Sequence, residues 1–218
     1  MILLEITPSR KHLTALRFSE EYLPEGAKPQ KDGLIYLDSD FCVEKKLAKG
    51  NEFDYHEIDE LYLESEKRRA KSKALWLLSR RDYPSGLLQK KLSETFNSEA
   101  ADYAVCRMVE LGLVNDTVYA KALAESLIKY KGVAPKHAPY LMAQKGVDLE
   151  LAKEVVEMRE DDPKESIAHL LETKYARKLS EPKGSEKVFA ALVRKGFSYS
   201  DIRAVMEKYA SDEIFSDY

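Results

Sequence analysis

The sequence has few of the residues that build redox, metal or nucleophilic sites. Its 218 residues include two cysteines and four histidines. Cys42 and Cys106 lie far apart without a Cys-x-x-Cys pair, so we expect no disulfide, and we expect Cys106 to be a core thiol. The histidines are scattered, and no two of them have the helical spacing of metal ligands, so the sequence predicts no metal centre.

Catalytic and membrane signatures are also missing. The sequence contains no Gly-rich phosphate loop, His-Glu-x-x-His motif or Gly-x-Ser-x-Gly motif. No apolar run approaches the ~20 residues that a membrane-spanning helix needs. The first residues, 1–6, include an acid and no cationic start, which disfavours export. We therefore expect a monomeric, cytoplasmic, non-enzymatic protein that has no cofactor and does not bind membranes.

Charge is abundant and segregated along the chain, although the formal net charge is only -3. Residues 51–66 contain seven acids and no Lys or Arg, whereas residues 67–91 contain nine bases and one acid. Residues 126–147 contain four lysines and no acid. Local patches, more than the total charge, decide which polyanion a protein can bind.

The N-terminal part of the chain predicts a small β-rich segment. Short apolar or alternating runs at 2–6, 13–18 and 34–37 are separated by loops rich in Pro and Gly. From Asp54 to Leu78 the apolar residues then follow a helical period. This pattern predicts a linker helix and leaves open whether it is one helix or two.

Internal similarity organises the rest of the sequence. Residues 142–147 match residues 192–197 at an offset of 192 − 142 = 50. Phe96 aligns with Val147 at an offset of 147 − 96 = 51. A period of this length predicts stacked supersecondary units. We expect Asp116 to cap the first helix of the second unit.

The predicted fold is mainly α, with three tandem three-helix (helix-turn-helix-like) repeats in an elongated curved array behind a small β-rich N-terminal segment. The predicted boundaries are 1–53 for the β-rich segment, 54–115 for the linker helix and first repeat, 116–161 for the second repeat, and 162–218 for the third repeat with an acidic tail from Asp212.

Several motifs carry a family resemblance through their order and spacing. They are Arg80-Arg81-Asp82-Tyr83-Pro84, Leu111-Gly112-Leu113-Val114-Asn115-Asp116, Gln144-Lys145-Gly146-Val147 and Arg194-Lys195-Gly196-Phe197. Through them, residues 66–210 resemble the RecX regulatory proteins. The sequence departs from the family pattern at Pro84 and Leu87, where the family favours Ser and Glu, so the usual cap of that helix is in doubt.

The resemblance implies a non-enzymatic modulator of the RecA recombinase. Such proteins bind RecA filaments and, weakly and without sequence preference, single- and double-stranded DNA. They restrain filament growth, ATP hydrolysis and strand exchange, in DNA repair, homologous recombination and the SOS response. The resemblance implies no cofactor.

Basic residues in each repeat are the candidates for contacting the filament or its DNA, because cations recurring along an elongated surface suit a phosphate backbone. For each one, the alternative is a solubilising surface charge. Tyr83 and Trp76 are candidates for stacking on bases, but Trp76 lies in an apolar run, which favours the core. The candidates are Lys67, Arg68, Lys71, Arg80, Arg81, Lys90, Lys91, Lys129, Lys131, Lys136, Lys145, Arg194 and Lys195.

Two other functions stay open. A DNA-binding transcriptional regulator of helix-turn-helix type would place a second helix in the major groove. Basic residues dispersed over three units fit that function less well than one concentrated recognition helix would. A helical scaffold that binds only protein, through the acidic residues 51–66, is the third possibility.

Overall fold

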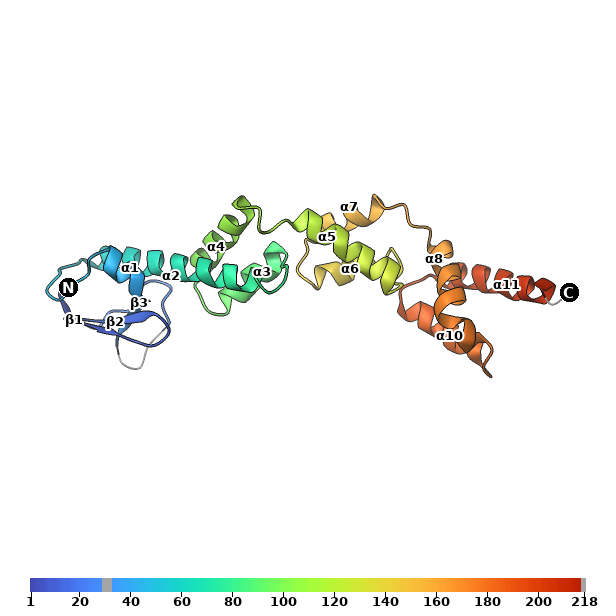
Figure 1. The fold of residues 1–218 in the computed structure, drawn as a ribbon, viewed down its shortest axis with the longest axis horizontal. Helices are drawn as coiled ribbons and strands as arrows, with labels where there is room; N and C mark the ends of the chain where they lie inside the picture. The colour runs from blue at the N-terminus through green and yellow to red at the C-terminus, as the bar shows by residue number, and fades with distance from the viewer. Residues whose placement is uncertain (29–32, 217–218) are drawn as a thin grey trace. The chain divides into compact units, whose positions relative to one another are not determined.

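The computed structural model describes residues 1–28 and 33–216. It is mainly helical with a small N-terminal sheet, as the sequence predicts (Figure 1). The chain divides into two compact parts, the N-terminal unit Met1–Val114 and the C-terminal unit Asn115–Tyr218. The first three-helix repeat lies in the N-terminal unit, and the other two lie in the C-terminal unit. The boundaries of the repeats and their curved array stay predictions.

Three antiparallel strands form the sheet, in the order β1-β2-β3. They are β1 (Leu3–Pro8), β2 (Leu13–Phe18) and β3 (Ile35–Asp38), close to the predicted runs. Leu3 pairs with Phe18, and Leu16 pairs with Ile35. Leu3, Leu16 and Ile35 are buried in one cluster with Ile58 of the following long helix. The sheet therefore depends on that helix to complete its core.

Two helices connect the sheet to the first repeat. The short α1 (Ser39–Glu44) was not predicted, and Asp38 caps it by accepting a hydrogen bond from the Phe41 N–H. The linker is one continuous helix, α2 (Tyr55–Leu78), which settles the question that the sequence left open. It begins with a capping box in which Asp54 and Glu57 each accept a hydrogen bond from the other's backbone N–H.

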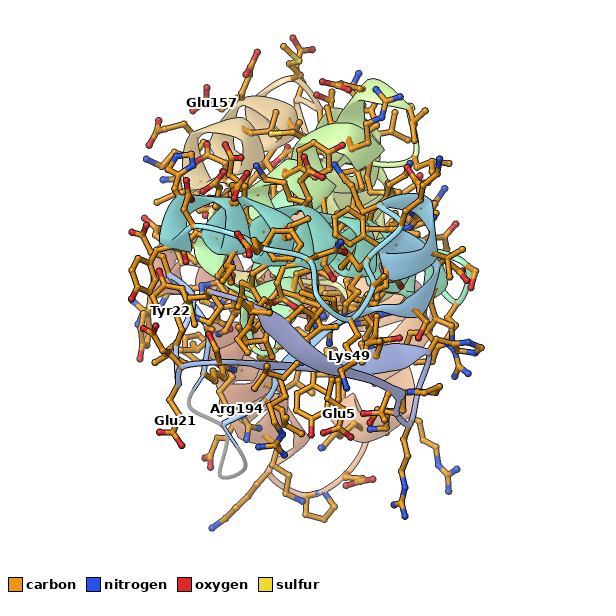
Figure 2. The ribbon with its side chains drawn as sticks, turned by 90° about the vertical axis from the view of Figure 1, so that its left-hand side faces the viewer. Glu5, Glu21, Tyr22, Lys49, Glu157 and Arg194 are labelled. Atoms are coloured by element: carbon orange, nitrogen blue, oxygen red, sulfur yellow. The ribbon has the colours of Figure 1, made fainter. Side chains whose placement is uncertain are left out.

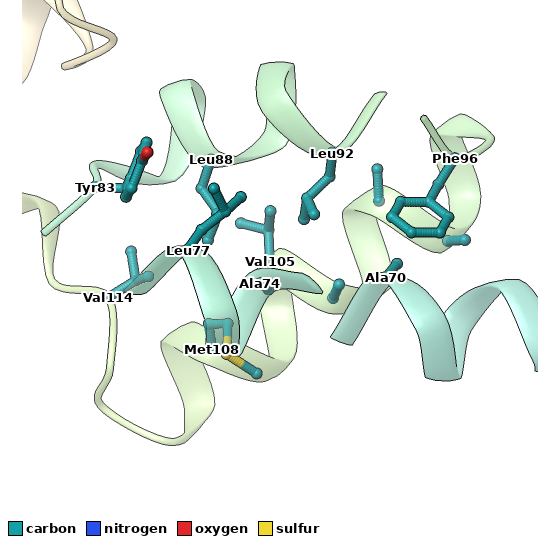
Figure 3. Packing of buried hydrophobic residues seen from close by; sticks show 13 residues of the cluster. Ala70, Ala74, Leu77, Tyr83, Leu88, Leu92, Phe96, Val105, Met108 and Val114 are labelled. Carbon is teal, nitrogen blue, oxygen red and sulfur yellow. The ribbon is translucent and has the colours of Figure 1, made fainter. Parts of the chain in front are cut away.

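The first repeat consists of the C-terminal part of α2, α3 (Ser85–Ser93) and α4 (Ser98–Glu110). Leu88 and Leu92 of α3, and Met108 of α4, are fully buried in its core (Figure 3). Alanines of α2 and α4 line the same core, and their small side chains let the two helices approach closely. Pro84 stands at the N-cap of α3 and gives no side-chain cap, as its departure from the family pattern suggested.

The second repeat contains α5 (Asp116–Glu125), the π-helical turn η1 (Ser126–Tyr130), α6 (Ala138–Ala143) and α7 (Leu149–Glu157). Its core includes Leu127, Met142 and Val156. The cap of α5 is Asn115, whose side chain accepts a hydrogen bond from the Val118 N–H at 3.0 Å. The prediction of Asp116 was therefore wrong by one residue, because an asparagine carbonyl caps as well as a carboxylate.

The third repeat contains α8 (Pro163–Leu170), the π-helical turn η2 (Leu171–Tyr175), α9 (Ala176–Leu179), α10 (Gly184–Arg194) and α11 (Tyr199–Ser216). Its core includes Ile167, Leu171 and Leu192. The backbone of α11 stays helical past Asp212, where we expected a frayed acidic tail.

The predicted internal similarity is visible in one buried apolar side chain that recurs before the third helix of each repeat. Phe96, Val147 and Phe197 are all buried at this position. In the second and third repeats, the N–H of this residue donates to a carbonyl five residues earlier at 3.3 Å. A glycine with positive φ precedes it, Gly146 at 89° and Gly196 at 91°. This is the Schellman ending of a helix, which a glycine makes without steric cost.

Within the C-terminal unit, the second and third repeats contact each other through this turn. The Ala134 N–H donates to the Lys195 carbonyl at 2.9 Å. A Cβ on Gly196 would collide with the side chain of His137 and lie 2.8 Å from its Cγ. Glycine at 196 therefore serves both the backbone conformation and the close approach of the two repeats.

Gly196→Ala should destabilise the protein more than Gly50→Ala. Both residues have nearly the same φ, 91° and 93°, so both variants carry the strain of a left-handed alanine, about 1–2 kcal/mol. A Cβ on Gly50 meets no atom within 4 Å, whereas the clash at Gly196 should add about 1–3 kcal/mol. Urea unfolding followed by circular dichroism measures both losses. Equal losses would contradict the packing inferred at Gly196.

Candidate nucleic-acid interface

Charged side chains cover the described surface, and Glu21, Lys49 and Glu157 are exposed examples (Figure 2). In the N-terminal unit, three of the candidate cations are neutralised by a carboxylate. The ion pairs are Lys67–Glu99 at 2.7 Å, Arg68–Glu44 at 2.6 Å and Lys91–Glu94 at 2.8 Å. Lys91 lowers the pKa of the Glu94 carboxyl by hydrogen bonding to it and by its charge. These partners cancel much of the positive potential that would attract a phosphate.

The other candidates of the N-terminal unit have no carboxylate partner among the described residues. Lys71, Arg80, Arg81 and Lys90 form no ion pair with any side chain in the described part of the chain. Arg80 and Arg81 instead stack on aromatic rings. The Arg80 Cζ lies 4.3 Å from the centre of the Trp76 ring, and the Arg81 Cζ lies 4.3 Å from the centre of the Tyr83 ring.

Lys73 belongs with this second group, although it was not among our candidates. Its Nζ lies 4.0 Å from the centre of the Trp76 ring, and no described carboxylate pairs with it. Lys71 is two residues before Lys73, so at about 100° per residue it lies on the other side of α2. The first-repeat cations therefore do not form a single surface.

Candidates in the C-terminal unit also differ in their partners. Lys129 pairs with Glu125 at 3.6 Å. Lys131, Lys136 and Lys145 are exposed and have no ion pair among the described residues. Arg194 is exposed and donates from Nε to the Ala190 carbonyl at 3.3 Å (Figure 2).

Lys195 has a structural contact. Its Nζ donates a hydrogen bond to the backbone carbonyl of Lys131, in the second repeat. Burial, and to a lesser extent the charge of Lys174, lowers the pKa of the Lys195 ammonium. Lys195 thus joins two repeats of the C-terminal unit, which leaves it less available to a phosphate than its exposed neighbour Arg194.

Comparisons with known proteins relate this chain to RecX regulatory proteins. A family model described as the third three-helix domain of RecX matches residues 160–206. The regulatory protein RecX of Clostridioides difficile is 28% identical over 190 residues, covering 80% of this chain and 87% of the relative. That of Bacillus subtilis is 28% identical over 183 residues, covering 81% of this chain and 69% of the relative. The chain is thus similar to RecX regulatory proteins over about four fifths of its length, and residues 160–206 match the third RecX domain.

Solved structures support the same fold. A crystal structure of a regulatory protein RecX covers 94% of this chain and 98% of its own, with a TM-score of 0.59 and 19% identity. The structure of RecX from Lactobacillus salivarius covers 66% of this chain and 96% of its own, with a TM-score of 0.55 and 22% identity. At these identities the likeness concerns the fold, and the named relatives support a regulator of RecX type.

Other kinds of site find little support in the described residues. They contain no group of three or more His, Cys, Asp or Glu residues that would hold a metal ion. None of the described helices is long and apolar enough to cross a membrane. Cys42 is buried, whereas Cys106 is exposed, so the prediction of a core thiol at Cys106 was wrong.

Sequence reasoning missed an exposed aromatic residue beside the candidate cations. Trp76 is 46% exposed, so the prediction that it lies in the core was wrong, whereas Tyr83 is buried at 9%. The apolar run Leu75–Leu78 is misleading because only Leu77 of this run is buried and Leu78 is partly buried. The spacing of Lys73, Trp76 and Arg80 at i, i+3 and i+7 was the signal that places them on one side of a helix.

A buried acid lies beside a cavity in the N-terminal unit. Glu66 of α2 is 4% exposed and accepts a hydrogen bond from Arg69, whose Cζ lies 5.5 Å from the centre of the Phe96 ring. A cavity of about 630 Å³ has Glu66, Arg69 and Tyr62 in its wall. Burial raises the pKa of Glu66 and outweighs the opposing charge of Arg69.

The stability of the variant Glu66→Gln relative to the parent should therefore rise with pH. A raised folded-state pKa means that Glu66 contributes stability below the unfolded value, about 4.3, and loses it as the pH rises through the folded pKa. Glutamine does not titrate. Urea unfolding at pH 4 and pH 7 measures the difference. Glu64→Gln, at an exposed position, is the control, and the same trend in both variants would contradict the role of burial.

Proposed function

We propose that this RecX-family protein binds filaments of the RecA recombinase on DNA and restrains their ATP hydrolysis and strand exchange. The observation that carries the proposal is that every repeat exposes cations that no described carboxylate neutralises. In the first repeat these include Arg80, Arg81 and Lys90, in the second Lys131, Lys136 and Lys145, and in the third Arg194. The relatives that are named regulatory proteins support the same function.

Phosphate contacts explain how such a surface would act. A cation that approaches a phosphate releases condensed counterions, so several weak contacts along a polymer add up to useful affinity that falls steeply with salt. Contacts of this kind do not depend on the base sequence, which suits a protein that must act wherever a filament has formed. Cations spread over three repeats fit a repeating polymer better than they fit one short operator.

The paired cations have a different role in this proposal. Lys67, Arg68, Lys91 and Lys129 each lie within 4 Å of a carboxylate, so they would have to give up a partner before meeting a phosphate. Lys195 would have to leave the Lys131 carbonyl. We therefore infer that these five candidates contribute less to filament binding than the unpaired ones.

Reversing both charges with Arg80→Glu and Arg81→Glu should weaken the inhibition of RecA. We expect the concentration for half-inhibition of ATP hydrolysis on single-stranded DNA to rise about tenfold or more, and to rise less at high salt, where phosphate contacts are already weak. The measurement is a titration of RecA filaments with protein at two salt concentrations. Arg10→Glu with Lys11→Glu, in the exposed turn between β1 and β2, makes the same charge change as a control.

The outcomes separate the candidate functions. Unchanged inhibition by a folded double variant would remove this part of the surface from the proposal. If the parent protein failed to inhibit at either salt, the proposed function itself would be wrong. Sequence-selective binding to duplex DNA without RecA would favour the transcriptional regulator, and loss of RecA association in a nucleic-acid-free pull-down would count against a scaffold that binds only protein.

A further inference from the structure

We propose that Trp76, flanked by Lys73 and Arg80, is a stacking platform for an unpaired base of single-stranded DNA. The proposal deepens the proposed function, on which it rests only for the choice of nucleic acid as the partner. It assigns one residue a contact with a base, where the surface cations offer contacts with phosphates alone.

The packing of the first repeat does not require an indole at position 76. The core of this repeat is closed by Leu77, Leu88, Leu92 and Met108, and Trp76 is not part of it. The aromatic side chains that reach this core, those of Tyr83 and Phe96, are 9% and 7% exposed, against 46% for Trp76. The indole is therefore free to contact a partner, and tryptophan is common at interfaces because it joins a large apolar surface to a polar N–H group.

The two neighbouring cations give this surface its specificity. The Lys73 Nζ and the Arg80 Cζ lie 4.0 Å and 4.3 Å from the centre of the ring, and both side chains are without an ion pair among the described residues. Cation–π contacts of this kind hold both charges over the ring. A base that stacks on the indole replaces one of these cations, which then stays close enough to meet the phosphate of the same nucleotide.

A single strand of DNA is the partner that matches both features. Each unpaired base offers a flat π-face, and the backbone that carries it brings a phosphate within reach of neighbouring cations. In a duplex the faces of the bases are already stacked on one another, so an indole can reach them only after unstacking. An acidic peptide would satisfy the cations and would leave the aromatic face without a matching group.

The single tryptophan of the chain makes the platform directly observable. Because the sequence has one Trp, its intrinsic fluorescence reports on position 76 alone. We expect an oligothymidylate to quench this emission. An abasic oligomer of the same length carries the same phosphates without bases, and we expect it to bind more weakly and to quench little.

Trp76→Leu should weaken binding of the labelled oligothymidylate, measured by fluorescence anisotropy, about fivefold or more. Its binding of the abasic oligomer should stay unchanged, and Trp76→Phe should retain most of the affinity because it keeps an aromatic ring. Tyr140→Leu is the matched control, since Tyr140 is 55% exposed and makes no cation–π contact in the described part of the chain. Circular dichroism confirms that each variant is folded.

Three results would overturn the platform. They are equal quenching by the abasic oligomer, an unchanged affinity of Trp76→Leu for oligothymidylate, and loss of RecA binding by Trp76→Leu in the absence of DNA, which would make Trp76 a protein contact. None of these depends on filament inhibition. A protein that binds oligothymidylate through Trp76 and fails to inhibit RecA would contradict the proposed function and leave the platform standing.

Discussion

The turn that leads into the third helix of each repeat places one large apolar side chain among three short helices. Phe96, Val147 and Phe197 fill this position, and burying such a side chain contributes about 1.5–3 kcal/mol. That is a large share of what a unit of this size can gain from its own core. The turn must also reverse the backbone within a few residues, which explains the positive φ of Gly146 and Gly196. Core and turn are therefore one constraint in the second and third repeats, whereas the first repeat keeps the buried side chain without the glycine.

The same constraint decides which charged residues are available for binding. A three-helix repeat with a small core exposes most of its side chains, so its sequence carries many charges for reasons of solubility. Helix α2 shows how far stability alone explains their order. Glu57 in its first turn suits the helix dipole, whereas its bases, at 67–73, stand before the last turn, where the dipole has little effect on them. Segregated charge along the sequence is thus a weak sign of function until the partners of each residue are known.

Sequence patterns predicted the architecture well because they report periodicity. The strands, the repeat and the break before α3 follow from apolar spacing and from Pro and Gly positions. Helix α1 was not predicted because six residues are too few to show a helical period. Its N-cap, Asp38, acts through a local hydrogen bond that the apolar pattern does not reveal. Lys195 looked like its neighbour Arg194, yet only the contact between repeats shows that its ammonium binds the Lys131 carbonyl. Exposure and pairing are tertiary properties, and composition does not encode them.

Trp76 shows how a misleading pattern becomes informative once the structure is known. Four large apolar residues in a row, Leu75–Leu78, cannot all face the core of a helix, because a buried stripe takes only those spaced by three or four. Leu77 is buried and Leu78 is partly buried, while Leu75 and Trp76 are 41% and 46% exposed. Of these four residues Trp76 alone has an aromatic ring, and Lys73 and Arg80 lie over it. A half-exposed indole between two cations that no described carboxylate neutralises has the chemistry that the proposed stacking platform requires.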